Sequence, residues 1–315
     1  MLRLADHWVW DSWHVDDGEN FHIFFLRASR ALLDSNRRHF RASIGHAISK
    51  DLRHWTLLPD ALVASDSPSW DDLATWTGST FLAPDNRWHL FYTGISRREN
   101  GWVQRIGHAL SDDLISWNKV GSKPVTVADK EWYEPLNFTD WPDQTWRDPW
   151  VFADSNGSGF HMLTTARNKT GDRLTRGVIG HATSIDLFTW KVQPPLSEPN
   201  EFGQLEVIQV EMIEGSAVLI FSCAPEHLSE PRRRSASFAG TYSAPAFSLL
   251  GPFDLNKAEL IDAPHIYAGR IVQDRSGQWN LLGFVNKSED GFFAGIICDP
   301  IPLILTNRGT LQVKK

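Results

Sequence analysis

Three carboxylates stand in short stretches whose composition suits chemistry on a sugar. The stretches are Trp8-Val9-Trp10-Asp11-Ser12-Trp13, Trp146-Arg147-Asp148-Pro149 and Gln204-Leu205-Glu206-Val207. Cleavage of an acetal needs one ionised carboxylate, one protonated carboxyl group and groups that hold the sugar. An indole-rich strand has no structural need for a charge, and aspartate is a poor strand former. We therefore interpret Asp11, Asp148 and Glu206 as one site that cleaves glycosidic bonds, with Arg147 keeping Asp148 ionised.

The chain is rich in tryptophan, with 15 Trp against 4 Tyr. A buried indole needs a partner for its N–H group, and its flat face can stack on the apolar face of a sugar ring. We expect Trp10, Trp13 and Trp76 to contact substrate, with Trp146 as a further wall. Packing in the core explains any one of these tryptophans nearly as well.

The elements that must position these residues are visible as an internal repeat. The pattern Ile-Gly-His-Ala-x-Ser-x-Asp-Leu-x-x-Trp starts at Ile44, Ile106 and Ile179. Each copy predicts an extended segment, a turn built on the serine and the aspartate, and a second short strand opened by the tryptophan. Because they recur in every copy, the histidines and aspartates are interpreted as scaffold rather than as a metal site. These residues are His46, His108, His181, Asp51, Asp113 and Asp186.

A second repeat consists of apolar segments that each follow a polar turn. They cover residues 21–26, 88–93, 160–165, 217–222 and 279–284. Five units in 315 residues leave 63 residues per unit, enough for a four-stranded blade with its loops. The predicted fold is all-β, a single five-bladed β-propeller over residues 1–315; a WD-type repeat would be shorter, about 40–45 residues. If the innermost strands carry the three carboxylates, their side chains meet at one end of the channel.

Composition narrows the range of partners. The net charge of −7 makes nucleic acid an unlikely partner, and Arg232-Arg233-Arg234 is interpreted as a solvated loop. No apolar stretch approaches the roughly 18 residues of a membrane span, and no signal sequence is apparent. Two cysteines without a Cys-x-x-Cys motif indicate neither a disulfide framework nor zinc. We expect a cytoplasmic protein that needs no metal or organic cofactor, and exposed edge strands or tryptophans could support a homodimer.

Ordered motifs resemble the five-bladed propeller enzymes that act on fructosides, glycoside hydrolase families 32 and 68. The segment Val9-Trp10-Asp11-Ser12-Trp13 resembles the levansucrase nucleophile motif, with His14 in place of proline. Four further segments resemble motifs of invertases and their relatives: Trp76-Thr77-Gly78-Ser79, Phe91-Tyr92-Thr93-Gly94, Arg147-Asp148-Pro149 and Ile266-Tyr267-Ala268. The resemblance runs from about residue 7 to about residue 300.

The resemblance implies a retaining β-fructofuranosidase acting on a small carbohydrate such as sucrose or a fructan, with transfructosylation as a second outcome. It assigns Asp11 as nucleophile, Asp148 as transition-state stabiliser and Glu206 as acid/base. Such an acid needs a raised pKa, which burial beside indoles could provide. Residues implied to bind substrate are Trp10, Trp13, Trp76, Ser79, Arg147, Gln204 and Tyr267.

The sequence also departs from these families. Invertases carry a C-terminal β-sandwich, for which the chain ends too soon, and Glu206 lacks the residues that follow the acid in either family. Gln204 replaces an acceptor-side carboxylate of levansucrases. The alternatives are an inverting propeller glycosidase for arabinofuranosides or xylosides, a non-catalytic sugar-binding propeller, and a propeller scaffold for protein partners.

Overall fold

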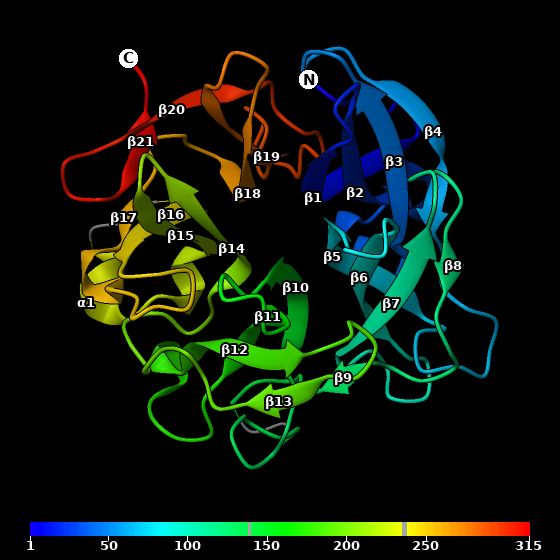
Figure 1. Ribbon diagram of the computed structural model, residues 1–315, viewed down its shortest axis with the longest axis horizontal. Helices are drawn as coiled ribbons and strands as arrows, with labels where there is room; N and C mark the ends of the chain where they lie inside the picture. Colours follow the sequence, from blue (N-terminus) through cyan, green and yellow to red (C-terminus); the bar gives the residue numbers. More distant parts are fainter. Residues whose placement is uncertain (138–139, 235–237) are drawn as a thin grey trace.

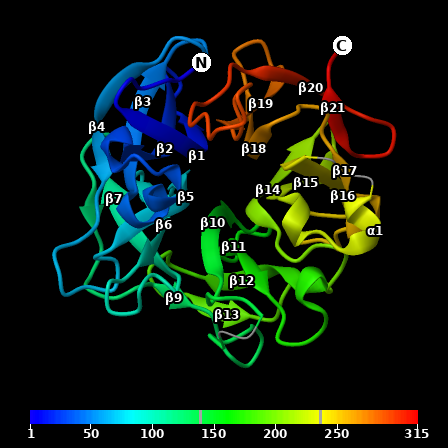
Figure 2. The ribbon, with the colours of Figure 1, turned by 180° about the vertical axis from the view of Figure 1, so that it is seen from behind.

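The computed structural model describes residues 1–137, 140–234 and 238–315, and its strands form five antiparallel sheets around one axis (Figure 1). Each sheet consists of consecutive strands, so each is one blade of a propeller. The predicted five-bladed β-propeller is confirmed. Seen from behind, the same five sheets surround the centre, and the two chain ends belong to neighbouring blades (Figure 2).

The strands of the blades follow the chain from the centre outward. Blade 1 contains β1 (His7–Asp16), β2 (Phe21–Ser29), β3 (Ser43–Ser49) and β4 (Thr56–Leu62). Blade 2 contains β5 (Ala74–Leu82), β6 (Trp88–Ile95), β7 (Arg105–Ser111) and β8 (Asn118–Lys119), with β9 (Thr126–Val127) also paired to β7. Blade 3 contains β10 (Trp146–Ala153), β11 (Phe160–Arg167), β12 (Gly177–Ser184) and β13 (Lys191–Gln193).

The last two blades have the same order. Blade 4 contains β14 (Glu206–Ile213), β15 (Ser216–Cys223), β16 (Gly240–Ala246) and β17 (Glu259–Leu260). Blade 5 contains β18 (Ile266–Gln273), β19 (Trp279–Val285), β20 (Ile301–Leu305) and β21 (Leu311–Val313). The apolar repeat segments are therefore the second strands, and the segments that carry the three carboxylates are innermost strands.

Helices are short and lie in the connections. The α-helix is α1 (Glu230–Arg233), and the 3-10 helices are η1 (Arg30–Leu32), η2 (Ser35–Arg41), η3 (Arg173–Thr175), η4 (Pro225–His227) and η5 (Leu255–Lys257). The prediction of a solvated loop at the arginine triplet is wrong for Arg232. This residue lies in α1, pairs with Glu201 at 2.9 Å and stacks on Phe202. Among the described residues, no helix is long and apolar enough to cross a bilayer.

The repeated histidines hold neighbouring strands together, as predicted. His46, His108 and His181 each share a 2.9 Å hydrogen bond with a histidine of the preceding strand. Burial lowers their pKa values to about 3, 3 and 4, so these rings are neutral. The repeated aspartates accept backbone N–H groups of their turns, for example Asp51 from Arg53 and His54. Both sets are scaffold.

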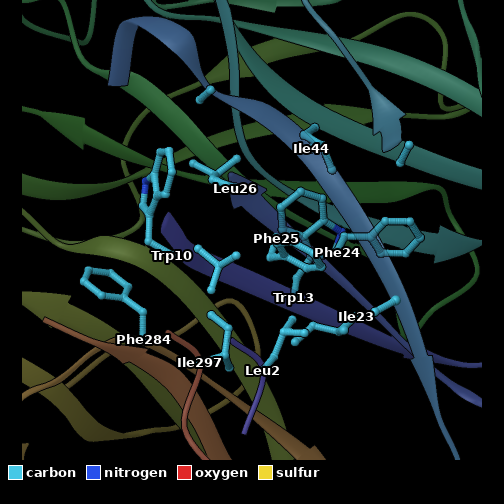
Figure 3. Close-up of a cluster of buried hydrophobic side chains, with 14 of the residues drawn as sticks. Leu2, Trp10, Trp13, Ile23, Phe24, Phe25, Leu26, Ile44, Phe284 and Ile297 are labelled. Carbon is cyan, nitrogen blue, oxygen red and sulfur yellow. The ribbon is translucent and has the colours of Figure 1, made fainter. Parts of the chain in front are cut away.

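The ring closes between blades 1 and 5. Leu2 forms an antiparallel bridge with Ile297, with N–H···O distances of 3.0 Å in both directions. An apolar cluster covers this seam, and Trp10 of β1 lies in it near Phe284 of β19 (Figure 3). The closure fixes the inner strands of the first and last blades beside each other at the centre.

Candidate active site

All five innermost strands have a β-bulge at the same level. Their pairing shifts after Trp10, Trp76, Arg147, Glu206 and Tyr267. A bulge re-aims the side chains on either side of it. These five side chains and the bulge residues Asp11, Thr77, Asp148 and Val207 line one cavity of about 630 Å³.

The bulges place the carboxylates in two different positions. Asp11 and Asp148 are bulge residues with positive φ angles of 26° and 56°, a conformation that costs free energy for a non-glycine residue and is typical of functional sites. Glu206 lies one residue earlier, at the position that Trp10 and Arg147 occupy in their own strands. The three carboxylates therefore do not occupy equivalent positions in their strands, although all three side chains reach the cavity.

Asp11 is held by one hydroxyl group and faces a second carboxylate. Thr77 Oγ1 donates to Asp11 Oδ2 at 2.6 Å. Burial, reinforced by the negative charges of Asp148 and Glu206, raises the pKa of Asp11 to about 7, and the Thr77 hydrogen bond opposes this rise. Asp11 therefore titrates near neutral pH, where both its protonated and its ionised form are present in the unliganded cavity.

Asp148 has hydrogen-bond partners in three blades. Its carboxylate accepts Thr165 Oγ1 at 2.9 Å and the Val207 N–H at 3.3 Å, while its own N–H donates to Thr93 Oγ1 at 3.0 Å. Arg147 Nε lies 3.4 Å from Asp148 Oδ2. Burial raises the pKa of Asp148 and outweighs the lowering by Arg147, so the expectation that Arg147 simply keeps Asp148 ionised is not supported.

Arg147 makes its shortest ion pair with Glu206, at 2.6 Å between Nη2 and Oε1. Tyr267 donates its hydroxyl to the other Glu206 oxygen. Burial raises the pKa of Glu206, but Arg147, with smaller contributions from His227 and Tyr267, outweighs burial and lowers it below its usual range. The expected raised pKa of the acid is wrong for the unliganded site, because the guanidinium lies against the carboxylate.

Most of the expected sugar contacts and walls line the cavity, and three do not. Trp10, Trp76, Arg147, Gln204 and Tyr267 line it. Trp13 and Ser79 follow the bulges of their strands and are buried in the scaffold, where Trp13 Nε1 donates to Thr80 Oγ1 and Ser79 Oγ accepts the Val151 N–H. Trp146 is likewise buried, against Tyr133.

Other lining residues were missed from sequence. They include Arg38 and His39 of η2, Thr77, Gln104, Trp141, Arg173, His227 and Asn286. The Trp141 ring lies between the guanidinium groups of Arg167 and Arg173, at 4.7 and 4.6 Å from its centroid, and its N–H has no partner among the described residues.

The site offers charged and hydroxyl-binding groups rather than a metal-ligand set. Within the described ranges, no cluster of three or more His, Cys, Asp or Glu residues has the arrangement of a metal site. Chemically, the cavity brings together two carboxyl groups whose pKa values are shifted in opposite directions, a third carboxyl group that also lines it, and indole walls. Such a set can attack an acetal carbon and protonate its leaving oxygen.

Comparisons with known proteins agree with this fold. A family model described as "Glycosyl hydrolases family 32 N-terminal domain" matches residues 15–293. A beta-fructofuranosidase insoluble isoenzyme of Arabidopsis thaliana is 26% identical over 291 residues, 84% of this chain and 50% of its own length. An acid beta-fructofuranosidase of Vicia faba is 42% identical over 142 residues, 44% of this chain and 20% of its own length. The chain thus spans half or less of the length of these two relatives.

Solved structures show the same architecture. An inulosucrase from Halalkalicoccus jeotgali, bound to kestose, superposes with a TM-score of 0.78 at 22% identity, covering 98% of this chain and 89% of that one. The levansucrase of Bacillus subtilis superposes with a TM-score of 0.75 at 19% identity, covering 99% and 87%. At these identities the likeness concerns the fold.

Proposed function

Because the chain belongs to glycosyl hydrolase family 32, we propose that it is a retaining β-fructofuranosidase acting on sucrose or a fructan, with transfer to a second sugar as a competing outcome. The observation that carries the proposal is the meeting of Asp11, Asp148 and Glu206, from three blades, in one indole-walled cavity. Family relatives named beta-fructofuranosidases support the choice of sugar.

In the proposed reaction, Asp11 attacks the anomeric carbon C2 of the fructosyl unit and forms a covalent intermediate. Glu206 protonates the leaving oxygen and then takes a proton from the incoming water or sugar. Asp148 accepts hydroxyl groups of the ring and stabilises the oxocarbenium-like transition state. A retaining mechanism of this kind expects the nucleophile and acid about 5–5.5 Å apart.

The productive protonation state is a minor one in the unliganded cavity. It requires Asp11 ionised and Glu206 protonated, whereas Asp11 has a pKa of about 7 and Arg147 holds that of Glu206 low. Activity is therefore limited by the small fraction of enzyme in which the proton lies on Glu206. A bound sugar that draws Arg147 away from Glu206 would increase that fraction.

The test is sugar release by the protein from sucrose, levan, inulin and an aryl arabinofuranoside. Free fructose, released first as the β-furanose in early NMR spectra, is expected from the wild type and not from Asp11→Asn. Asp112→Asn, in an exposed turn of blade 2, is the matched control and should keep full activity. Arabinose release would indicate an arabinofuranosidase of the related propeller type. Sugar binding without any release would indicate a non-catalytic sugar-binding propeller.

A further inference from the structure

Gln104 lies where a connection of blade 2 meets blade 3. It is 3% exposed, directly precedes β7 and lines the cavity. Its backbone N–H donates to the Gln144 carbonyl at 3.3 Å, which ties this connection to the segment that leads into β10. The Gln104 side chain is therefore held beside Arg147, the second residue of β10.

The amide of Gln104 joins a cation to an anion. Its Oε1 accepts Arg147 Nη1 at 3.2 Å and the Trp146 N–H at 3.3 Å, and its Nε2 donates to Asp143 Oδ2 at 2.9 Å. Burial raises the pKa of Asp143, but Arg167 and Arg147 outweigh burial and lower that pKa, so this carboxyl group is ionised. Because a guanidinium and a backbone N–H can only donate and a carboxylate can only accept, these partners require this orientation of the amide.

The two ends of the Arg147 guanidinium face different acidic groups. Nη2 lies 2.6 Å from Glu206 Oε1, whereas Nη1 lies 3.7 Å from Asp143 Oδ2, beyond hydrogen-bond distance. Nη1 donates instead to two neutral oxygens, those of Gln104 and Thr145, at 3.2 Å each. Thr145 Oγ1 in turn donates to Asp143 Oδ2 at 2.7 Å, the same oxygen that accepts from Gln104. Two neutral groups therefore stand between Nη1 and the Asp143 carboxylate.

The hydrogen bonds of the Gln104 amide keep Arg147 and Asp143 apart. Removal of the amide frees a donor of Arg147 and an acceptor site of Asp143 that lie 3.7 Å apart. Opposite charges at such a distance attract more strongly in a buried site than in water. The guanidinium would therefore move toward Asp143, and its contact with Glu206 would weaken.

Other ionisable groups also interact with Glu206. They are Tyr267 of β18, His227 of η4, Asp11 of β1, Asp148 of β10 and Cys223 of β15. Within the described part of the chain, the Gln104 side chain forms hydrogen bonds with none of these groups. The path of contacts from Gln104 to Glu206 runs through Arg147.

We propose that Gln104 is a positioning residue that directs the guanidinium of Arg147 to Glu206 and keeps it from Asp143. The inference rests on the proposed function, because Glu206 is the proposed acid/base. Gln104 acts on Glu206 through Arg147, and the position of the guanidinium decides how readily Glu206 takes up the proton that the leaving oxygen needs.

The first test titrates Glu206 directly and needs no activity. The protein is labelled with glutamate that carries carbon-13 at the side-chain carboxyl carbon, and the Glu206 signal in NMR spectra is assigned by its loss in Glu206→Gln. Gln104→Met keeps the length of the side chain without its amide, and it should raise the pKa of Glu206 by about one unit. Gln104→Asn keeps an amide that is too short to reach both partners, so it should shift the pKa in the same direction. This second variant decides the question where Gln104→Met does not fold.

Gln209→Met is the matched control. Gln209 of β14 is also buried, and its amide bonds Glu211 and the backbone of Ile271. This variant should leave the titration of Glu206 in place. An unmoved Glu206 titration in the Gln104 variants, or an equal shift in the control, would overturn the proposal.

The second test asks whether Asp143 is the competing site. Asp143→Asn keeps the shape of the side chain and removes its charge, so Gln104→Met should shift the pKa of Glu206 much less in this background. The full shift in both backgrounds would refute the competition between the two carboxylates. The acid limb of kcat/KM for sucrose should follow the NMR titration in each variant. An NMR shift that the acid limb does not follow, or an inactive wild type, would speak against the proposed function alone.

Discussion

Removal of the hydrogen bond from Thr77 to Asp11 is the most direct test of the proposed nucleophile. Thr77→Val keeps the shape and branching of the side chain and removes only the hydroxyl that donates to Asp11 Oδ2 at 2.6 Å. The bond stabilises the ionised carboxylate, so its loss raises the pKa of Asp11 further above about 7. Because Asp11 must be ionised to attack, the variant should be less active.

The size of the effect follows from the strength of the bond. A hydrogen bond to a charged group contributes about 1.5–3 kcal/mol, and one pKa unit corresponds to about 1.4 kcal/mol. Loss of the hydroxyl should therefore raise the pKa of Asp11 by about one to two units. The productive fraction depends on the difference between the pKa values of Asp11 and Glu206, so it should fall about tenfold to hundredfold.

The assay is kcat/KM for sucrose between pH 4 and 10, which reports the free enzyme. With the pKa of Asp11 above that of Glu206, the acid limb follows Glu206 and the basic limb follows Asp11. Thr77→Val should therefore lower the plateau about tenfold to hundredfold and move the basic limb upward by about one to two pH units. The acid limb should stay in place.

Thr75→Val is the matched control. Thr75 lies two residues earlier in β5, is fully buried, and its hydroxyl has no hydrogen-bond partner within the described part of the chain. This variant should leave both limbs and the plateau unchanged. A Thr77→Val enzyme with the wild-type basic limb would refute the reasoning, and an equal loss in both variants would trace the effect to the strand rather than to the bond.

Two further predictions concern the same carboxyl groups. The folded-state pKa of Asp11, about 7, lies above its unfolded value near 3.8, so stability from its bound proton is present at low pH and lost as the pH rises through about 7. Asp11→Asn should accordingly raise Tm at pH 8 by several degrees and by almost nothing at pH 4, as measured by calorimetry. Tyr267→Phe removes the hydroxyl that donates to Glu206. The pKa of Glu206 should rise and the acid limb of kcat/KM should move up by about one pH unit, and an unmoved acid limb would contradict the assignment of that limb to Glu206.

The architecture was predictable because each blade repeats a local set of contacts. The histidine pairs, such as His46 with His22, join adjacent strands, and the serine–aspartate turns close on themselves within a few residues. Such contacts need the same residue types in each blade, so they appear as a repeat in the sequence. The bulges do not appear as a repeat, because the residues around them differ in every blade.

The wrong and missing predictions of site residues also concern features that do not repeat along the sequence. A strand that alternates regularly would place Trp13 on the face of Asp11, but the bulge at Asp11 shifts the alternation, and Trp13 turns into the scaffold. Trp141 and Arg38 lie in connections, and their approach to the cavity depends on how blades and loops pack. The order of the pKa values depends on the ion pair between Arg147 and Glu206, residues 59 positions apart.

The bulges also place side chains of different chemistry at the same position of each blade. The residue before each bulge reaches the cavity from its own blade, and in five blades this position holds an indole twice, a guanidinium, a carboxylate and a phenol, namely Trp10, Trp76, Arg147, Glu206 and Tyr267. None of these side chains is needed for the histidine pairs or turns that hold the blades together. Exchange of Arg147, Glu206 or Tyr267 can therefore alter acid strength or sugar contacts while the histidine pairs and turns stay intact, which is why the Tyr267 variant should report on chemistry rather than on folding.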